Sequence, residues 1–229
     1  MRIGGNWGTG VLVLAALGLG AVPASAQVAE QFTQTQRENA LALRKYEWKS
    51  RVEVRREGET KSSQLFLMRY GADGNLQRTL IEGTQPSEAP RMPLKRIIVK
   101  KKTKEFQETV AELSALAQSY ANLSPERMQA LLASANVITP IAGPSDALQV
   151  EAKNVLKTGD LLTLWIDSGT HQQRKVEIRT FLDDHPVTVV SEFRSLPQGP
   201  TYAARVVAEY PRERMQLVTD AFDVALTNP

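Results

Sequence analysis

The chain has 229 residues, a formal net charge of +3 and no cysteine, and 42% of its residues are hydrophobic. This length and apolar content predict a packed core in one large domain and exclude a chain that is disordered throughout. The lack of cysteine excludes disulfides, thiolate metal sites and a cysteine nucleophile. Because the net charge is small, electrostatic arguments must rest on local clusters of charge.

The first 26 residues have the pattern of an export signal. Arg2 is the only charged residue before Glu30, an apolar run covers residues 11–22, and Ala24-Ser25-Ala26 is a small-x-small cleavage site. The apolar run is short for a membrane anchor, so cleavage is the favoured interpretation. We expect a mature periplasmic chain that begins at Gln27, is soluble and carries no lipid anchor. Removal of Arg2 lowers its formal charge from +3 to +2.

The first part of the mature chain predicts a helix followed by three strands. Residues 28–44 contain no glycine or proline and carry a modest apolar stripe, which favours a helix. Residues 46–56 alternate between aromatic or aliphatic residues and charged ones, so one face of this strand is buried or lines a cavity. Strands at 64–70 and 76–82 are expected to pair, since Asp73-Gly74 between them is a strong hairpin signal.

A proline-containing polar loop at 83–93 leads into a basic segment at 91–104. The loop is either a contact site or a solvated connector. The basic segment has seven Lys or Arg residues and no acid, and Ile97, Ile98 and Val99 among them predict a short edge strand. Its basic residues either prevent unwanted strand pairing or dock the protein on an anionic membrane surface or an acidic partner. The docking residues in the second case are Lys95, Arg96, Lys100, Lys101, Lys102 and Lys104.

A helical hairpin is predicted at about residues 103–136, between two sets of strands. Apolar residues such as Phe106, Val110 and Leu113 recur at three- and four-residue spacing in its first helix, at 103–122. Ser124 and Pro125 begin the second helix, with serine as N-cap and proline at the first helical position.

Residues 147–224 predict an antiparallel meander. Short alternating stretches are separated by turn sequences such as Thr158-Gly159-Asp160 and Asp183-Asp184-His185-Pro186. The strands are expected at 148–156, 161–167, 176–182, 187–193, 202–210 and 214–224. No βαβ alternation is present, so the predicted class is α+β with an antiparallel sheet that is open or curled into a partial barrel.

Two stretches resemble the LolA/LolB-like superfamily of periplasmic lipoprotein carriers and lipoprotein-sorting proteins. They are Tyr46-Glu47-Trp48-Lys49-Ser50-Arg51-Val52, and Leu164-Trp165-Ile166-Asp167 followed by a turn and Arg174-Lys175-Val176-Glu177-Ile178. The resemblance lies in the order of elements over residues 27–224. It implies a single half-open β-barrel domain over residues 27–229, capped by helices, with an apolar cavity that holds acyl chains. No functional residue of the family is carried over to this chain.

The sequence supports neither catalysis nor a bound cofactor. His171 and His185 both lie in predicted turns, without the ligand spacing of a zinc site. No nucleophile elbow and no glycine-rich phosphate loop occur in the mature chain. We therefore expect a protein that is not an enzyme and needs no metal or cofactor. The export signal and the lack of aromatic residues within the basic segment argue against nucleic acid as a partner.

The aromatic residues define the candidate ligand site. We predict that three groups of residues meet: those on the inward faces of the early strands, those of the apolar stripe of the long helix, and a tryptophan of a later strand. They either line a cavity for a hydrophobic ligand or fill a closed core. The set is Tyr46, Trp48, Val52, Phe66, Met68, Tyr70, Phe106, Val110, Leu113 and Trp165.

The leading functional hypothesis is an exported binding or carrier protein for a lipid, a lipoprotein acyl chain or another hydrophobic ligand. The helical cap would open to admit the ligand, and docking through residues 91–104 would release it. The alternative is an envelope sensor or interaction protein that has a filled core and binds a protein partner. A continuous apolar cavity between sheet and helices would favour the carrier.

Overall fold

The computed structural model describes residues 24–83, 93–121, 123–138 and 147–227. The apolar run of the expected export signal and most of the polar loop lie outside these ranges. Helix α1 (Ala24–Leu43) begins ahead of the predicted cleavage site, so cleavage after Ala26 would leave a helix that starts at Gln27. The cleavage itself stays a prediction.

Helices α2 (Pro93–Ala121) and α3 (Pro125–Ser134) form the predicted hairpin, but α2 begins ten residues earlier than expected. The short edge strand predicted within residues 91–104 is therefore wrong, because residues 93–104 are the first turns of α2. The β-branched residues Ile97, Ile98 and Val99 suggested a strand. The lysine, arginine and leucine residues around them favour a helix, however. Extending the helix that follows also avoids the free-energy cost of nucleating a new element. At α3, the Ser124 side chain accepts a hydrogen bond from the Arg127 amide, as the capping pattern predicted.

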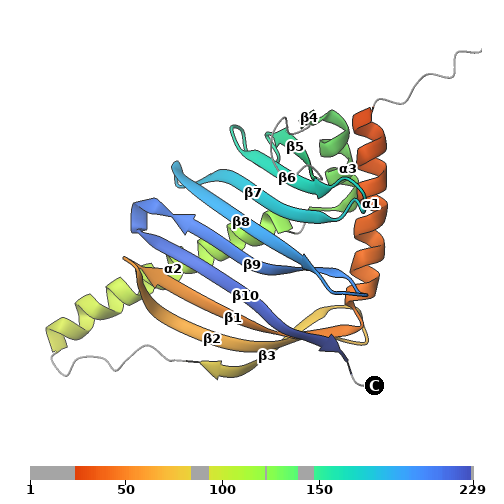
Figure 1. Ribbon diagram of the computed structural model, residues 1–229. Helices are drawn as coiled ribbons and strands as arrows, with labels where there is room; N and C mark the ends of the chain where they lie inside the picture. Colours follow the sequence, from red (N-terminus) through yellow and green to blue (C-terminus); the bar gives the residue numbers. More distant parts are fainter. Residues whose placement is uncertain (1–23, 84–92, 122, 139–146, 228–229) are drawn as a thin grey trace, which may run out of the picture.

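Ten strands form one antiparallel sheet within the described residues, in the order β3-β2-β1-β10-β9-β8-β7-β6-β5-β4 (Figure 1). The sheet is open and curved, and α2 passes along one of its faces, so the predicted α+β half-barrel is confirmed. The strands are β1 (Tyr46–Arg56), β2 (Glu59–Tyr70), β3 (Leu76–Gly83), β4 (Asn136–Ile138), β5 (Ala147–Lys153), β6 (Leu161–Asp167), β7 (Gln173–Leu182), β8 (His185–Ser195), β9 (Thr201–Tyr210) and β10 (Met215–Leu226).

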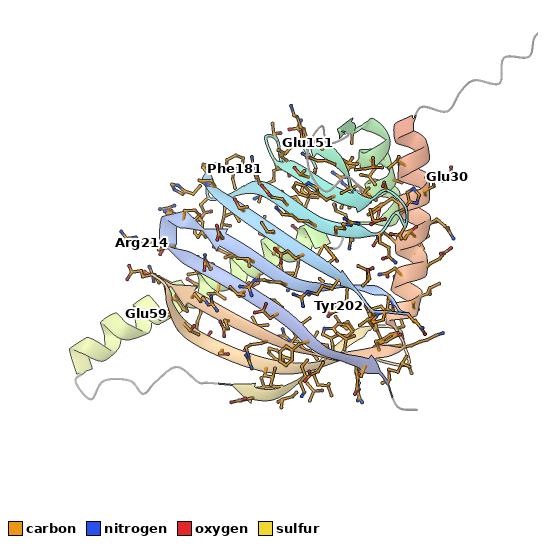
Figure 2. All side chains as sticks on the ribbon, in the orientation of Figure 1. Glu30, Glu59, Glu151, Phe181, Tyr202 and Arg214 are labelled. Carbon is orange, nitrogen blue, oxygen red and sulfur yellow. The ribbon has the colours of Figure 1, made fainter. Side chains whose placement is uncertain are left out.

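The last strand, β10, pairs with the first, β1, in the interior of the sheet. A single 3-10 turn, η1 (Pro211–Glu213), leads from β9 into β10, which then pairs with β1 along most of its length. The β1–β2 and β9–β10 turns meet, since the amide of Glu57 donates to the carbonyl of Arg214 at 2.9 Å. Figure 2 shows Arg214 and Glu59 at this end of the sheet, opposite α1.

The two faces of the sheet differ sharply. The face toward α2, called the inner face below, carries the core residues of β5 to β9, among them Val150, Leu164, Ile178 and Val189, all at most 5% exposed. Leu113, Leu116 and Tyr120 of α2 and Phe32 of α1 pack onto them. The outer face carries ion pairs, for example Arg205 with Asp220 at 2.8 Å. Alternation with period two places apolar and charged residues on opposite sides of each strand.

Candidate functional site

The inner face of β1 and β2 carries six of the residues predicted to contact a ligand. We call them the aromatic surface: Tyr46, Trp48, Val52, Phe66, Met68 and Tyr70. The pairing of Trp48 with Met68 and of Ser50 with Phe66 fixes the register that brings them onto one face. Phe66 is 8% exposed and the other five are partly exposed. The aromatic surface is therefore an apolar patch that the fold covers only in part.

Two rings on the aromatic surface pack against each other. The centroids of Trp48 and Tyr70 are 6.1 Å apart, with the ring planes tilted by 55°. Helix α2 packs against β7, β9 and β10, and α1 packs against α3 and β9. Neither helix makes its main contacts with β1, β2 or β3 in the described part of the chain. Aromatic contacts of this kind stabilise the patch by roughly 1 kcal/mol each beyond area burial.

Edge strand β3 borders the aromatic surface. Leu76 and Leu80, which pair with Tyr70 and Phe66, are 49% and 55% exposed. Arg78 lies between them on the same face, with its guanidinium carbon 5.0 Å from the centroid of the Phe66 ring. We call these three residues the β3 rim. They were not predicted as site residues, because their position beside the aromatic surface follows only from the register of β2 with β3.

A second arginine lies at the hairpin end of the aromatic surface. Arg44 follows α1, and its Nη1 lies 3.4 Å from the position that a Cβ atom on Gly74 would occupy. Burial raises the pKa of Tyr70 above its ordinary value, and the positive charge of Arg44 acts in the opposite direction. Arg44 is thus close enough to Tyr70 for its positive charge to be felt at this end of the aromatic surface.

Phe106, Val110 and Leu113 belong to the packed part of the molecule. Leu113 is fully buried, and Phe106 and Val110 pack on the same core cluster. The ring of Phe106 also faces Arg56, whose guanidinium carbon lies 6.0 Å from its centroid. These three residues fill the space between α2 and the sheet, whereas the aromatic surface lies beside that space.

Trp165 does not belong to the inner face, which corrects the prediction that it lines the site. Its neighbours Leu164 and Ile166 point into the core, so Trp165 points to the outer face, where Nζ of Lys175 lies 4.6 Å from its ring centroid. The alternation of Leu162, Leu164 and Ile166 in the sequence contained this information. The apolar character of both faces of the stretch obscured it.

The predicted docking residues lie in the first turns of α2. The backbone of residues 93–104 is helical, so Lys95, Arg96, Lys100, Lys101, Lys102 and Lys104 share one helix instead of an edge strand. Lys104 is exposed, and its Nζ lies 3.6 Å from Oε1 of Glu108, one turn further along. An exposed pair of this kind contributes little to stability and leaves the lysine accessible to solvent.

Asp160 is a buried carboxylate with an anchoring role. It is 1% exposed, and it accepts hydrogen bonds from the amides of Val155, Leu156 and Lys157 and from the hydroxyl of Tyr120, 2.6 Å away. Burial by itself would raise the pKa of Asp160, but these donors outweigh burial and lower the pKa below its ordinary value. Tyr120 lies near the end of α2, so this network joins α2 to the turn between β5 and β6.

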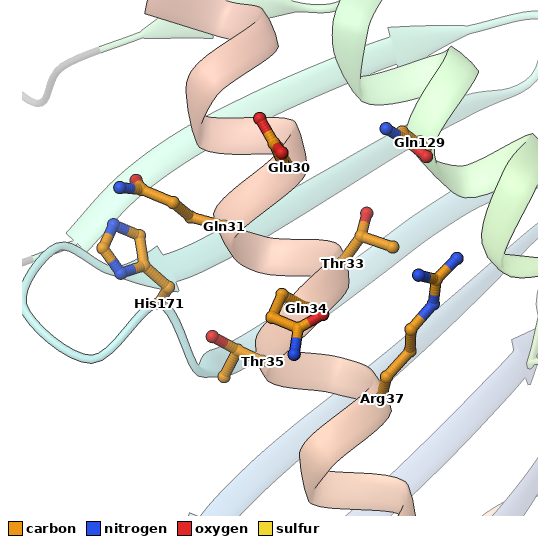
Figure 3. Close-up of a pocket in the computed structure, with 8 residues that line it drawn as sticks. All are labelled: Glu30, Gln31, Thr33, Gln34, Thr35, Arg37, Gln129 and His171. Carbon is orange, nitrogen blue, oxygen red and sulfur yellow. The ribbon is translucent and has the colours of Figure 1, made fainter.

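A polar hollow of about 570 Å³ lies between α1, α3 and the β6–β7 turn (Figure 3). Its lining includes Thr33, Arg37, Gln129 and His171, and no residue of the aromatic surface. Thr33 Oγ1 donates to the carbonyl of Ala29 within α1. Such a lining suits water and small polar molecules rather than a hydrophobic ligand.

Metal-binding geometry is absent from the described residues, where no three His, Asp or Glu side chains converge. His171 lies in the β6–β7 turn and His185 begins β8. Asp167 lies at the start of the same turn as His171. A hydrogen bond from the amide of Thr170 has the largest effect on the pKa of Asp167, and together with a hydrogen bond from Arg174 it lowers this pKa to about 2.

Among the described helices, none is long and apolar enough to cross a bilayer.

Several solved structures match the chain, and the following three do so over most of its length. A DUF1329 family protein from Desulfovibrio piger is 12% identical, with a TM-score of 0.39, over 90% of this chain and 92% of that one. A LolA superfamily protein from Nitrosomonas europaea is 9% identical, with a TM-score of 0.40, over 88% and 94%. An outer membrane lipoprotein-sorting protein domain from Vibrio parahaemolyticus is 10% identical, with a TM-score of 0.43, over 87% and 94%.

Two of these structures, the LolA superfamily protein and the lipoprotein-sorting protein domain, carry the names of the superfamily that the order of elements in this chain resembles. At these identities and TM-scores, the similarities carry no argument about residues or ligands of this chain. No protein-family model matches the sequence, and no curated protein matches it.

Proposed function

We propose that this protein is an exported, non-enzymatic binding or carrier protein for a hydrophobic ligand, such as a lipid or the acyl chain of a lipidated protein. One observation carries the proposal: the aromatic surface is apolar and only partly covered, next to the exposed Leu76 and Leu80 of the β3 rim. A contiguous apolar patch of this kind on a folded protein is typical of a binding surface.

Binding at this surface requires no catalytic group. Each methylene that an acyl chain buries contributes about 0.8 kcal/mol, so ten of them supply roughly 8 kcal/mol before the cost of association. The unbranched side chain of Met68 suits a surface that adapts to chains of different length. The ligand site lies on β1 and β2 and the β3 rim, not between α2 and β5 to β9, where the core is filled.

The proposal can be tested by native mass spectrometry of the protein purified from the periplasm, followed by extraction of bound molecules. A co-purifying lipid or lipopeptide of defined mass supports a carrier. In parallel, a fluorescent fatty acid is titrated into the wild type and into Trp48→Ala and Trp165→Ala variants. We expect lost uptake in the first variant and normal uptake in the second, because the two tryptophans lie on opposite faces.

Release at a membrane is the second part of the proposal. The basic first turns of α2 would bring the protein to an anionic surface, since each Lys or Arg near such a surface contributes about 1 kcal/mol. Reversal of charge at Lys100, Lys101 and Lys102 is expected to abolish binding to phosphatidylserine-containing vesicles. A matched variant with reversals at Arg69, Lys153 and Arg194, all exposed on the sheet, changes the net charge equally. Equal loss in both variants would contradict a docking role for α2.

The filled core between α2 and β5 to β9 favours a second candidate, an envelope interaction protein. In that case the aromatic surface would contact a protein rather than a lipid. A clean mass without bound molecules, together with no uptake of the fluorescent fatty acid, would favour this candidate over the carrier.

A further inference from the structure

The inner face of β1, β2 and β3 has an unusual distribution of charge. From Tyr46 to Val54 on β1, from Ser62 to Tyr70 on β2 and from Leu76 to Leu80 on β3, no inner position holds an acidic residue. Arg78 is the only charged residue among these positions. The outer face of β1, in contrast, carries both acids and bases: Glu47, Lys49, Arg51, Glu53 and Arg55.

Among the described residues, Arg78 and Arg44 form no ion pair with a carboxylate, as is also true of Arg69 and Arg194, whereas Arg55, Arg56, Arg174, Arg179 and Arg205 each form one. The nearest hairpin acid, Asp73, is engaged locally, because both of its oxygens accept hydrogen bonds from Asn75. The two arginines therefore offer positive charge that the protein itself does not neutralise in this part of the chain.

The guanidinium of Arg78 is placed to bind an anion. Its guanidinium carbon lies over the Phe66 ring, 5.0 Å from the ring centroid, and this cation–π contact depends on the charge of the group. The five N–H donors at the edge of a guanidinium suit bidentate binding of phosphate or carboxylate. Arg78 is exposed and pairs with Met68, while Arg44 lies near Tyr70, so both arginines border the stretch from Met68 to Tyr70.

We infer that the ligand of this surface is an anionic amphiphile, with a phosphate or carboxylate head held by Arg78 and Arg44 and an apolar chain lying along Trp48, Met68 and Phe66. This inference rests on the proposed function and narrows its ligand class. These arginines discriminate between headgroups, because an anionic head forms charge-assisted hydrogen bonds with them and an uncharged head does not.

The test compares myristoyl lysophosphatidate with monomyristoylglycerol, which share one acyl chain and differ in charge. In a Trp165→Phe variant of the mature chain that begins at Gln27, Trp48 is the only remaining tryptophan, so its fluorescence reports occupancy of the aromatic surface. We expect the anionic ligand to bind at least about tenfold more tightly, as one charge-assisted pair suffices for such a difference. Added salt should reduce this preference.

Arg78→Gln should reduce the preference for lysophosphatidate, and Arg44→Gln/Arg78→Gln should lower the affinity for lysophosphatidate to the level of monomyristoylglycerol. Arg78→Lys, which keeps the charge but cannot bind the head bidentately, should retain only part of the preference. Arg69→Gln is the matched control, because Arg69 is exposed on the outer face of β2 and its loss changes the net charge equally. Equal binding of both lipids to the wild type, or a preference that survives Arg44→Gln/Arg78→Gln, overturns the inference. If neither lipid binds, the proposed function fails and the inference fails with it.

Discussion

Asp160 shows how one buried side chain positions a helix. Its carboxylate gathers three backbone amides of the β5–β6 turn and the hydroxyl of Tyr120, and the Tyr120 oxygen also lies 2.8 Å from Oγ1 of Thr180 on β7. Every buried side-chain nitrogen or oxygen of the described residues has a partner. The network therefore meets the requirement that a buried charge be fully hydrogen-bonded.

Substitution of Asp160 tests this network. Asp160→Asn replaces one acceptor oxygen with a donor that faces other donors, so we expect the free energy of unfolding to fall by about 2–4 kcal/mol. The measurement is urea unfolding followed by far-UV circular dichroism. Asp183→Asn, in an exposed turn, is the control and should change stability little. Equal stability of the two variants would refute the anchoring role of Asp160.

The lowered pKa of Asp160 predicts that the stability of the protein depends on pH. Hydrogen bonds hold the pKa of Asp160 below the unfolded value, which is about 4, and Asp167 behaves in the same way with a folded pKa of about 2. A lowered folded pKa stabilises the protein above the unfolded pKa, and this contribution is lost as the pH falls through the folded pKa. We expect the stability difference between wild type and Asp160→Asn to shrink below about pH 4. A constant difference from pH 7 to pH 3 would contradict this.

Strand β3 illustrates how an edge strand can serve binding rather than stability. All eight of its residues are exposed, and Leu76, Leu80 and Ile81 are large apolar residues at an edge of the sheet. Edge strands are usually blunted by charge or shortened, as β4 with three residues is at the opposite edge. An exposed apolar edge therefore favours a binding role for β3.

The Leu80→Ser substitution tests whether β3 contributes to ligand binding rather than to stability. Because Leu80 is 55% exposed, we expect its loss to change the free energy of unfolding by less than about 0.5 kcal/mol. Uptake of the fluorescent fatty acid should nevertheless fall, since Leu80 pairs with Phe66 beside the aromatic surface. Leu41→Ser on α1, at a residue 60% exposed, provides the same change away from the surface and should leave uptake unaltered. Unchanged uptake in the Leu80 variant would place the ligand elsewhere.

At the scale of the whole molecule, β10 holds the sheet together. It lies between β1 and β9 and so joins the early hairpin strands, which carry the aromatic surface, to the later meander that carries the core. Met215 and Val218 of β10 are 2% and 1% exposed, although they lie on opposite faces. Pairing of the last strand with the first has a long sequence separation, which makes it costly in chain entropy.

A chain that ends at Arg214 should therefore lose cooperative unfolding, because β1, β2 and β3 have no other strand to join. Loss of residues 228–229 alone should be tolerated, since the contacts of Thr227 with the carbonyl of Lys45 would remain. Urea unfolding of the two truncations, followed by circular dichroism, distinguishes them. A cooperative transition in the shorter chain would show that the meander folds without β10.

Local sequence patterns determined much of this fold. The bounds of β1 and β6, the capped start of α3 and the hairpin at Asp73-Gly74 follow from alternation, side-chain capping and turn preference, all of which act over a few residues. For the same reason, six members of the predicted ligand set share one face of a hairpin. Trp165 was assigned to the wrong face despite a readable alternation, because the residues around it are apolar on both sides.

Only the tertiary structure decided which parts of the inner face are covered. The sequence left a cavity and a filled core as alternatives. The fold fills the space between α2 and β5 to β9 and leaves the aromatic surface partly open. The pairing of β10 with β1, the approach of Arg44 to Tyr70 and the place of Arg78 over Phe66 also depend on the fold. Local patterns specify which face of an element is apolar, but its partner is set by the packing of the whole chain.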